Sequence, residues 1–349
     1  MNALRVCLFC AAMLLASPQI ALAIVIPSVA TQITDPSYYL APYDSVHDVN
    51  LNGVVMLNIG GAYCSGALIS QTQVLTAAHC MFGPAPVVNF ITPGNTTLPI
   101  LADSFIVDPA YGGDFSTGAD LAVVHLSSAA PVWATIYQLF NGLYTTGSTL
   151  TMAGFGYTGT GDTGETALDL VRRWGENSYD TDGSAYGLSS KIKIGDFDNG
   201  QLDQNVIKGS SLGLPDEVDI GHGDSGGPTF YNGMLIGVHD IIDCITDVGG
   251  GSCLSPPSVV ASAQPNSYYG ELFGDTSVQG NAAWLQSVMT PEPGSSGVLL
   301  VAFAAMAGAG LYRTRRRRIS SESCSRSASD RVRRAMPVRT SSSDAMCAR

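Results

Sequence analysis

Short runs of apolar and β-branched residues recur along the middle of the chain, and glycine, proline or asparagine separates one run from the next. This pattern is typical of the strands of a β-sandwich or β-barrel. Two short helices are expected besides: one turn around 77–79, and a closing helix over 281–289 in which Ala282, Leu285 and Met289 share a face. The runs that predict strands are 54–59, 67–69, 74–76, 121–124, 149–153 and 234–238.

Composition supports a globular body with many turns. Hydrophobic residues make up 45% of the 349 residues and charged residues 13%, so the chain can bury a core. The 39 glycines and 18 prolines indicate frequent turns. We expect the glycine-rich stretch 154–164 to be a surface loop, and it lacks the lysine that a phosphate-binding P-loop requires.

Charge is divided unevenly along the chain. Between residues 24 and 290 there are five basic and 25 acidic residues, whereas 11 of the 17 lysines and arginines lie at or after Arg313. An acidic body repels a phosphate backbone, which argues against a nucleic-acid partner.

The first 23 residues have the pattern of a signal peptide. Arg5 is the lone positive charge, an apolar run over 6–16 follows, and 21–23 reads Ala-Leu-Ala, which fits the small-x-small rule for cleavage. A retained membrane anchor is the alternative interpretation. Cleavage would leave an N-terminal segment over 24–49 and would place the body in an oxidising compartment, where cysteines pair.

Four cysteines lie in the exported body, and an even number there suggests two disulfides. The simplest pairing is local, Cys64 with Cys80 and Cys244 with Cys253, although four cysteines allow three connectivities. The body has no C-x-x-C pair, and the chain has no H-E-x-x-H. We therefore expect no metal site.

Three motifs carry residues suited to nucleophilic catalysis. They read Leu-Thr-Ala-Ala-His-Cys, Asp-Leu-Ala-Val-Val and Gly-Asp-Ser-Gly-Gly-Pro, around His79, Asp120 and Ser225. A serine hydroxyl needs a base to take its proton, and an imidazole titrates near neutrality. A carboxylate can hold the other ring nitrogen of that imidazole. These residue types indicate His79 as the base, Asp120 as its partner and Ser225 as the nucleophile.

In this order the motifs resemble those of the trypsin-like serine proteases of the chymotrypsin fold. The histidine precedes the aspartate by 41 residues, and the serine follows after a further 105. The resemblance covers 50–289 and implies an all-β fold. Two antiparallel six-stranded β-barrels, about 50–140 and 145–289, would be followed by a short C-terminal helix. The implied function is a serine endopeptidase that cleaves protein or peptide substrates through an acyl-enzyme and needs no cofactor.

The resemblance also implies roles for backbone groups near the nucleophile. The N–H groups of Gly223 and Ser225 would form an oxyanion hole. Asp224 would pair with a freshly cut N-terminus, and removal of the first 23 residues would expose Ile24 for that role. A later cut, or another partner for Asp224, is the alternative.

Two further residues would determine specificity. Asp219 lies six residues before the nucleophile, where the family places the acid at the base of a pocket for Arg or Lys side chains. Ile242 would narrow the entrance of that pocket. The alternative is that Asp219 is a solvated loop acid, because Asp216 and Glu217 lie beside it.

The C-terminal part carries a second signal. Pro-Glu-Pro at 291–293 precedes an apolar stretch over 297–312 and an arginine cluster at 315–318. This order resembles the PEP-CTERM sorting signal of Gram-negative bacteria, here 290–318. It implies processing by an exosortase, transient membrane association through 297–312, and secretion or delivery to the outer membrane or extracellular matrix. A plain membrane anchor is the alternative. We expect the Ser- and Arg-rich tail, 319–349, to be disordered.

A non-enzymatic function is the main alternative for the body: a catalytically silent, protease-like protein that binds at the cell surface or in the matrix. A binding module does not need a base, a carboxylate and a nucleophile together. The presence of all three residue types therefore favours the enzyme.

Overall fold

The structure is a computed structural model that describes residues 24–27, 38–200, 205–207, 217–243 and 266–289. The predicted signal peptide, sorting signal, apolar stretch 297–312, C-terminal tail and Cys244–Cys253 pair lie outside these ranges. Within them, no helix combines the length and apolarity that a membrane crossing requires.

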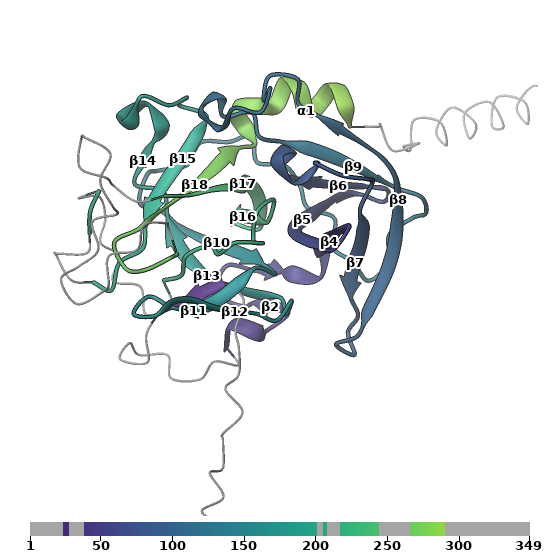
Figure 1. Cartoon of the computed structure of the whole chain (residues 1–349), viewed down its shortest axis with the longest axis horizontal. Helices are drawn as coiled ribbons and strands as arrows, with labels where there is room; N and C mark the ends of the chain where they lie inside the picture. The colour runs from purple at the N-terminus through teal and green to yellow at the C-terminus, as the bar shows by residue number, and fades with distance from the viewer. Residues whose placement is uncertain (1–23, 28–37, 201–204, 208–216, 244–265, 290–349) are drawn as a thin grey trace, which may run out of the picture. The chain divides into compact units, whose positions relative to one another are not determined.

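Six antiparallel strands close into the first barrel, drawn at the right of Figure 1 in the order β4-β5-β6-β9-β8-β7. Successive side chains of a strand point to opposite faces. Inward residues such as Leu57, Leu68, Val88 and Val123 are fully buried and fill the interior. The strands are β4 (Val54–Ile59), β5 (Ala62–Ser70), β6 (Gln73–Thr76), β7 (Val87–Ile91), β8 (Thr97–Val107) and β9 (Ala122–Leu126).

The second half is a seven-stranded antiparallel sheet that forms a half-barrel, in the order β13-β10-β16-β17-β18-β15-β14. Leu150, Met152, Ile236 and Phe273 belong to its buried core. With the closed barrel and one short helix, this sheet confirms the predicted fold class. The strands are β10 (Thr149–Gly154), β13 (Arg173–Ser178), β14 (Thr181–Asp182), β15 (Ile192–Asp196), β16 (Pro228–Tyr231), β17 (Met234–Asp243) and β18 (Leu272–Ser277).

The glycine-rich stretch 154–164 is not a surface loop, so that prediction was wrong. It contributes to a hairpin of β11 (Tyr157–Thr160) and β12 (Gly164–Leu168), and β1 (Ile24–Ile26) pairs with β11 in parallel. Phe155 and Thr158 are almost fully buried there. Packing of these few side chains outweighs the preference of glycine for turns.

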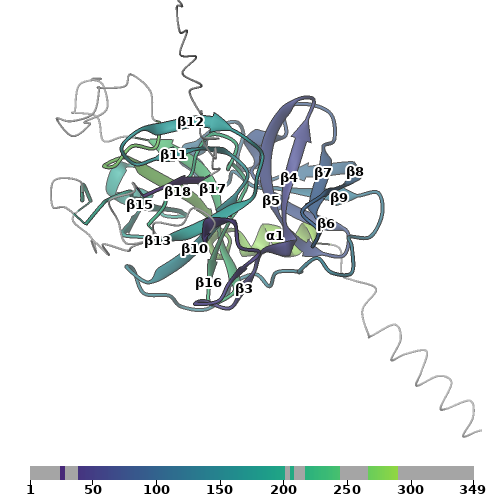
Figure 2. The ribbon, with the colours of Figure 1, turned by 90° about the horizontal axis from the view of Figure 1, so that it is seen from below.

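The N-terminal part of the body packs against the second sheet (Figure 2). The ring of Tyr38 lies 4.9 Å from that of Trp174, and Thr151 Oγ1 donates a hydrogen bond of 2.7 Å to Asp44. This segment therefore joins the strand β1 region to the first barrel along the surface of the second sheet. Its elements are η1 (Tyr38–Leu40), β2 (Tyr43–Asp44), β3 (Val49–Asn50) and η2 (Leu51–Gly53).

The helix α1 (Ala282–Val288) follows the last strand of the second sheet but packs against the first barrel. Leu285 is fully buried in the core that the two halves share, and Gln73 Nε2 donates to the carbonyl of Val288 at 3.2 Å. Both predicted helical segments are confirmed, the other being the 3₁₀ turn η3 (Ala78–Cys80). The remaining 3₁₀ turns are η4 (Phe115–Thr117), η5 (Gly183–Tyr186) and η6 (Gln279–Asn281).

A disulfide joins Cys64 of β5 to Cys80 of η3, which confirms the first predicted pairing. The cross-link spans 16 residues and fixes the turn that carries His79 to the wall of the barrel.

Replacing both cysteines with alanine should lower the free energy of unfolding by about 3 kcal/mol, because the unfolded chain regains the entropy of an open loop. Urea unfolding followed by tryptophan fluorescence, under non-reducing conditions, measures this difference. An unchanged unfolding free energy in the double variant would contradict the stabilising role.

Candidate active site

His79 extends from the edge of the first barrel. Strand β6 ends at Thr76, and the chain then turns through η3, whose last residue, Cys80, is anchored by the disulfide. The His79 side chain is 22% exposed, and the ring of Phe115 lies 5.4 Å from the imidazole. The imidazole is thus held from one side and open to solvent on another.

Asp120 lies two residues before the buried start of β9 and is itself fully buried. Its Oδ1 accepts the backbone N–H of His79 at 2.7 Å, and its Oδ2 lies 2.5 Å from His79 Nδ1. Burial alone would raise the pKa of Asp120, but hydrogen bonds from His79 and Asp240, with the charge of His79, hold it below its ordinary value. The carboxylate therefore stays ionised and fixes the orientation of the imidazole.

Ser225 lies in the loop that leads into β16 of the second sheet. The backbone N–H of Ser65, on β5, donates to the Ser225 carbonyl at 2.8 Å. The Sγ atom of Cys80 lies 3.7 Å from the same carbonyl oxygen. The loop that carries Ser225 thus contacts β5 and η3, the two elements of the first barrel that the disulfide joins.

Gly226 allows this contact because it has no side chain. Its φ of 80° lies in the left-handed region, and a Cβ there would come within 2.1 Å of Thr76 Oγ1. Thr76 and Cys80 lie on either side of His79 in the chain, so these contacts hold the loop of Ser225 against the turn that carries His79. The loop of Ser225 and the turn of His79 therefore lie next to each other where the first barrel contacts the second sheet.

Two backbone donors at the nucleophile loop are free. Gly223 has a φ of 96°, and its carbonyl is held by a hydrogen bond from Ser65 Oγ at 3.0 Å. Within the described part of the chain, neither the Gly223 N–H nor the Ser225 N–H has a hydrogen-bond acceptor. These two groups are available to a developing oxyanion.

Asp224 is fully buried behind the nucleophile. Its two carboxyl oxygens accept the N–H groups of Gly156 at 2.7 Å and Gly221 at 2.8 Å. Burial nevertheless raises the pKa of Asp224 to about 6. Two neutral donors do not fully replace the water that this carboxylate would have outside the protein.

Ile24 lies in the same region. It is fully buried and pairs with Thr158 of β11, while Val25 and Asp219 exchange backbone hydrogen bonds of 3.0 and 2.9 Å. The φ of Ile24 is 57°, a region that β-branched residues rarely adopt. The start of the body is therefore inserted beside the segment that leads to the nucleophile.

Asp219 is fully buried, so the alternative of a solvated loop acid was wrong. Its Oδ1 accepts the N–H of Ile220 at 2.8 Å, whereas its Oδ2 has no hydrogen-bond partner among the described residues. Burial, followed by the negative charge of Glu271, raises the pKa of Asp219 well above its ordinary value. The other predicted specificity residue, Ile242, is half-buried on β17 opposite Phe273.

Sequence reasoning missed Asp240, an acid 7% exposed on β17. Single atoms of His79, Asp120 and Asp240 all lie within 4.8 Å of one another. The available signal was an acidic residue two positions after the apolar run 234–238 that predicts this strand. It also missed Phe115, whose contact with His79 depends on the tertiary fold.

Potential metal ligands come together in a few places within the described ranges. In one of them, His47 Nδ1 lies 3.0 Å from Asp44 and 3.1 Å from Glu176, so the imidazole already bridges both carboxylates. In another, both cysteine sulfurs are used by the disulfide. The absence of a metal stays a prediction. The groups are Asp44-His47-Glu176, Cys64-His79-Cys80 and His79-Asp120-Asp240.

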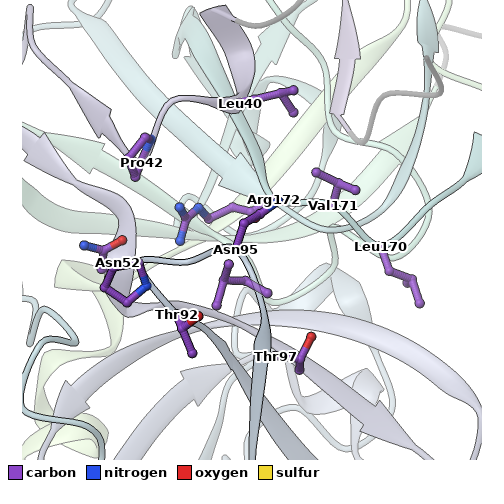
Figure 3. A pocket seen from close by; sticks show the side chains of 11 residues that line it. Leu40, Pro42, Asn52, Thr92, Asn95, Thr97, Leu170, Val171 and Arg172 are labelled. Carbon is purple, nitrogen blue, oxygen red and sulfur yellow. The ribbon is translucent and has the colours of Figure 1, made fainter.

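A pocket of about 520 Å³ lies apart from the triad, between the N-terminal segment and the β7–β8 hairpin (Figure 3). Arg172 extends into it between Pro42 and Asn52 and donates to the Leu51 carbonyl at 3.0 Å. Burial lowers the pKa of this arginine. The pocket contains no triad residue, so we do not assign the substrate to it.

Comparison with known proteins agrees with this geometry. The family model described as Trypsin matches residues 46–261. A trypsin of Saccharopolyspora erythraea is 30% identical over 224 residues, which cover 61% of this chain and 87% of that protein. A brachyurin of Leptuca pugilator is 31% identical over 189 residues, or 50% of this chain and 74% of that protein. The chain therefore belongs to the trypsin family of serine endopeptidases.

Proposed function

We propose that this protein is an exported endopeptidase that hydrolyses peptide bonds with His79, Asp120 and Ser225. The observation that carries the proposal is the pair of contacts from Asp120 to His79 beside the Ser225 loop. Asp120 holds Nδ1, which leaves Nε2 to take the proton of the Ser225 hydroxyl. The serine oxygen then attacks the peptide carbonyl, His79 protonates the leaving amine, and water hydrolyses the resulting ester.

The free N–H groups of Gly223 and Ser225 would stabilise the oxyanion that forms during this attack. The carbonyl of Gly223 is held away by Ser65, which keeps the peptide plane in one orientation. Donors fixed before the reaction need no reorganisation as charge develops, and each is worth about 10²–10³ in rate.

We propose that cleavage before Ile24 activates the enzyme. The new ammonium group would pair with Asp224, whose carboxylate is buried with two neutral donors. Cleavage would also remove the preceding peptide group and with it the unfavourable φ of Ile24. Removal of the signal peptide would then be the activating cut.

Preference for Arg or Lys substrates is supported by the electrostatics around Asp219. Glu165, Asp224 and Glu271 all raise its pKa, so the negative groups gather in one region. Of Asp219 and these three acids, Glu165 alone forms an ion pair in the described part of the chain, and its partner is His222. A substrate guanidinium or ammonium would supply a missing cation, with Ile242 at the entrance.

The destination of the protein is proposed from its sequence. Residues 1–23 would direct export, and an exosortase would process the PEP-CTERM signal at 290–318 after transient membrane association through 297–312. The mature enzyme would then reach the outer surface or the extracellular matrix of a Gram-negative bacterium. Its acidic body would keep it soluble there.

Labelling with a fluorophosphonate probe tests the catalytic proposal, with intact mass as the readout. The mature protein should gain one label, and Ser225→Ala should lose it together with about 10⁶-fold of its peptidase kcat. Ser127→Ala is the matched control, because this serine is exposed and lies outside the three motifs. Absence of label on folded protein that begins at Ile24 would favour the silent binding protein instead.

A single alanine added before Ile24 tests the activation proposal. It should abolish activity, because the ammonium moves by about 3.5 Å away from Asp224. An alanine inserted after the exposed Gly94 is the control and should be tolerated. Unchanged activity in the extended protein would exclude Ile24 as the activating terminus.

The same extension should change the pH dependence of stability. An unpaired Asp224 has a pKa of about 6, above that of an aspartic acid in the unfolded chain. The folded protein therefore binds the proton more tightly than the unfolded chain, and its free energy of unfolding falls as the pH rises from about 4 through 6. Pairing with the ammonium removes this loss. Urea unfolding at pH 5 and pH 7 in the Ser225→Ala background should show the steeper decline in the extended protein.

Asp219→Asn tests the specificity proposal. It should lower kcat/KM for Arg and Lys substrates by at least about 100-fold relative to leucine substrates, because a buried cation would lose its counter-ion. Asp162→Asn removes one negative charge from an exposed turn and serves as the control. An equal loss for all substrates would contradict a role of Asp219 in cation recognition.

A further inference from the structure

Asp240 is held rigidly by the nucleophile loop. The N–H of Gly226 donates to the carbonyl of His239 at 2.8 Å, and the N–H of His239 donates to the carbonyl of Gly227 at 2.9 Å. These bonds fix the two residues that follow Ser225 to the residue preceding Asp240. On its other side β17 pairs with β18 through His239 and Ile241, so the irregular position of Asp240 in this ladder is held from both neighbouring residues.

The Asp240 carboxyl has one protein donor. Its Oδ2 accepts the hydroxyl of Thr276, on β18, at 2.8 Å, and Thr276 is itself fully buried. Its Oδ1 is buried and has no donor among the described residues. One oxygen of this carboxyl, one ring nitrogen of His79 and one carboxylate oxygen of Asp120 all lie within 4.8 Å of one another. An ionised Asp240 would place two buried carboxylates side by side, with one imidazole as their neighbour.

The distribution of donors decides which acid carries the proton. Asp120 receives a backbone N–H and faces the imidazole nitrogen, so its ionised form is stabilised. Asp240 accepts a hydrogen bond from one neutral group, the hydroxyl of Thr276. Two adjacent carboxyl groups in a dry site do not both ionise, and the less well solvated one keeps its proton.

We propose that Asp240 is a neutral carboxylic acid at the pH of catalysis and donates a hydrogen bond from its Oδ1 hydroxyl to the Asp120 carboxylate. It would thereby act as a positioning residue that connects the sheet carrying Ser225 to the acid of the first barrel. This inference rests on the proposed catalytic role of Asp120.

The surrounding groups agree with a neutral Asp240. Burial, then its contact with Asp120, raises the pKa of Asp240 well above the ordinary value, and the charge of Asp275 adds to this. Asp275, on β18, is itself held by His239, Tyr179 and Thr229. Tyr111 faces both acids from the loop after β8. Burial and then the charges of Asp120 and Asp240 raise the pKa of Tyr111 to about 12.

Asp240→Ala and Asp240→Asn separate a donor from a merely structural side chain. The alanine variant should lose about ten-fold in kcat with little change in KM, because a hydrogen bond to a charged group is removed. Asparagine keeps a donor of similar shape and should recover most of that loss. Asp103→Asn, at an exposed position of β8, is the control for removal of an acid.

The pH profile of kcat/KM reports the charge of Asp240. If Asp240 is neutral while His79 titrates, asparagine replaces one neutral group with another and the acid limb stays in place. If Asp240 is ionised, the same change removes a negative charge beside His79 and moves the acid limb to lower pH by about one unit or more. Such a shift would overturn the proposal.

Infrared difference spectroscopy tests the proton without activity. Ser225→Ala and Ser225→Ala/Asp240→Asn are compared at pH 7, and the proposal expects the carbonyl band of one protonated carboxyl to disappear in the double variant. The Ser225→Ala/Asp103→Asn protein should keep that band. Loss of the band, together with absence of peptidase activity in the mature protein that keeps Ser225, would support the neutral Asp240 and reject the proposed function. Retention of the band would reject the inference alone.

Discussion

The hydrogen bond from the Ser65 N–H to the Ser225 carbonyl is the contact on which the catalytic geometry depends. His79 and Asp120 belong to a barrel that closes on itself, whereas Ser225 belongs to the other sheet. A triad tolerates displacements of only a fraction of an ångström. The disulfide holds β5 to η3, and the missing side chain of Gly226 lets the loop of Ser225 approach both elements closely.

The buried acids show that donors, rather than burial, decide which carboxyl stays ionised. Asp120, Asp219 and Asp224 are all fully buried. Asp120 alone faces an imidazole and a backbone N–H, and its pKa falls, whereas those of the other two rise. An acidic body with five bases between residues 24 and 290 can therefore hold one charge firmly at the centre of the site.

Local patterns were sufficient to predict much of the fold. The strand runs, the closing helix and the Cys64–Cys80 pair involve residues close in sequence or strongly patterned. The hairpin over 157–168 was missed because its glycines suggest a loop, and only packing around Phe155 and Thr158 makes it a pair of strands. The contact of Asp240 with Asp120 joins residues 120 positions apart on different sheets, so no local pattern predicts it.

The order of the strands along the chain also sets the order in which the site can be assembled. All six strands of the first barrel lie between Val54 and Leu126, so this barrel can close once those residues have left the ribosome. Strand β1 can pair only after β11 has been synthesised, and Val25 can bond to Asp219 only after residue 219 has been added. At about 5–20 residues per second, the serine follows Asp120 by about 5–20 s. If these residues act as proposed, a growing chain holds His79 and Asp120 in place before Ser225 has been made, and it cannot digest its own unfolded remainder.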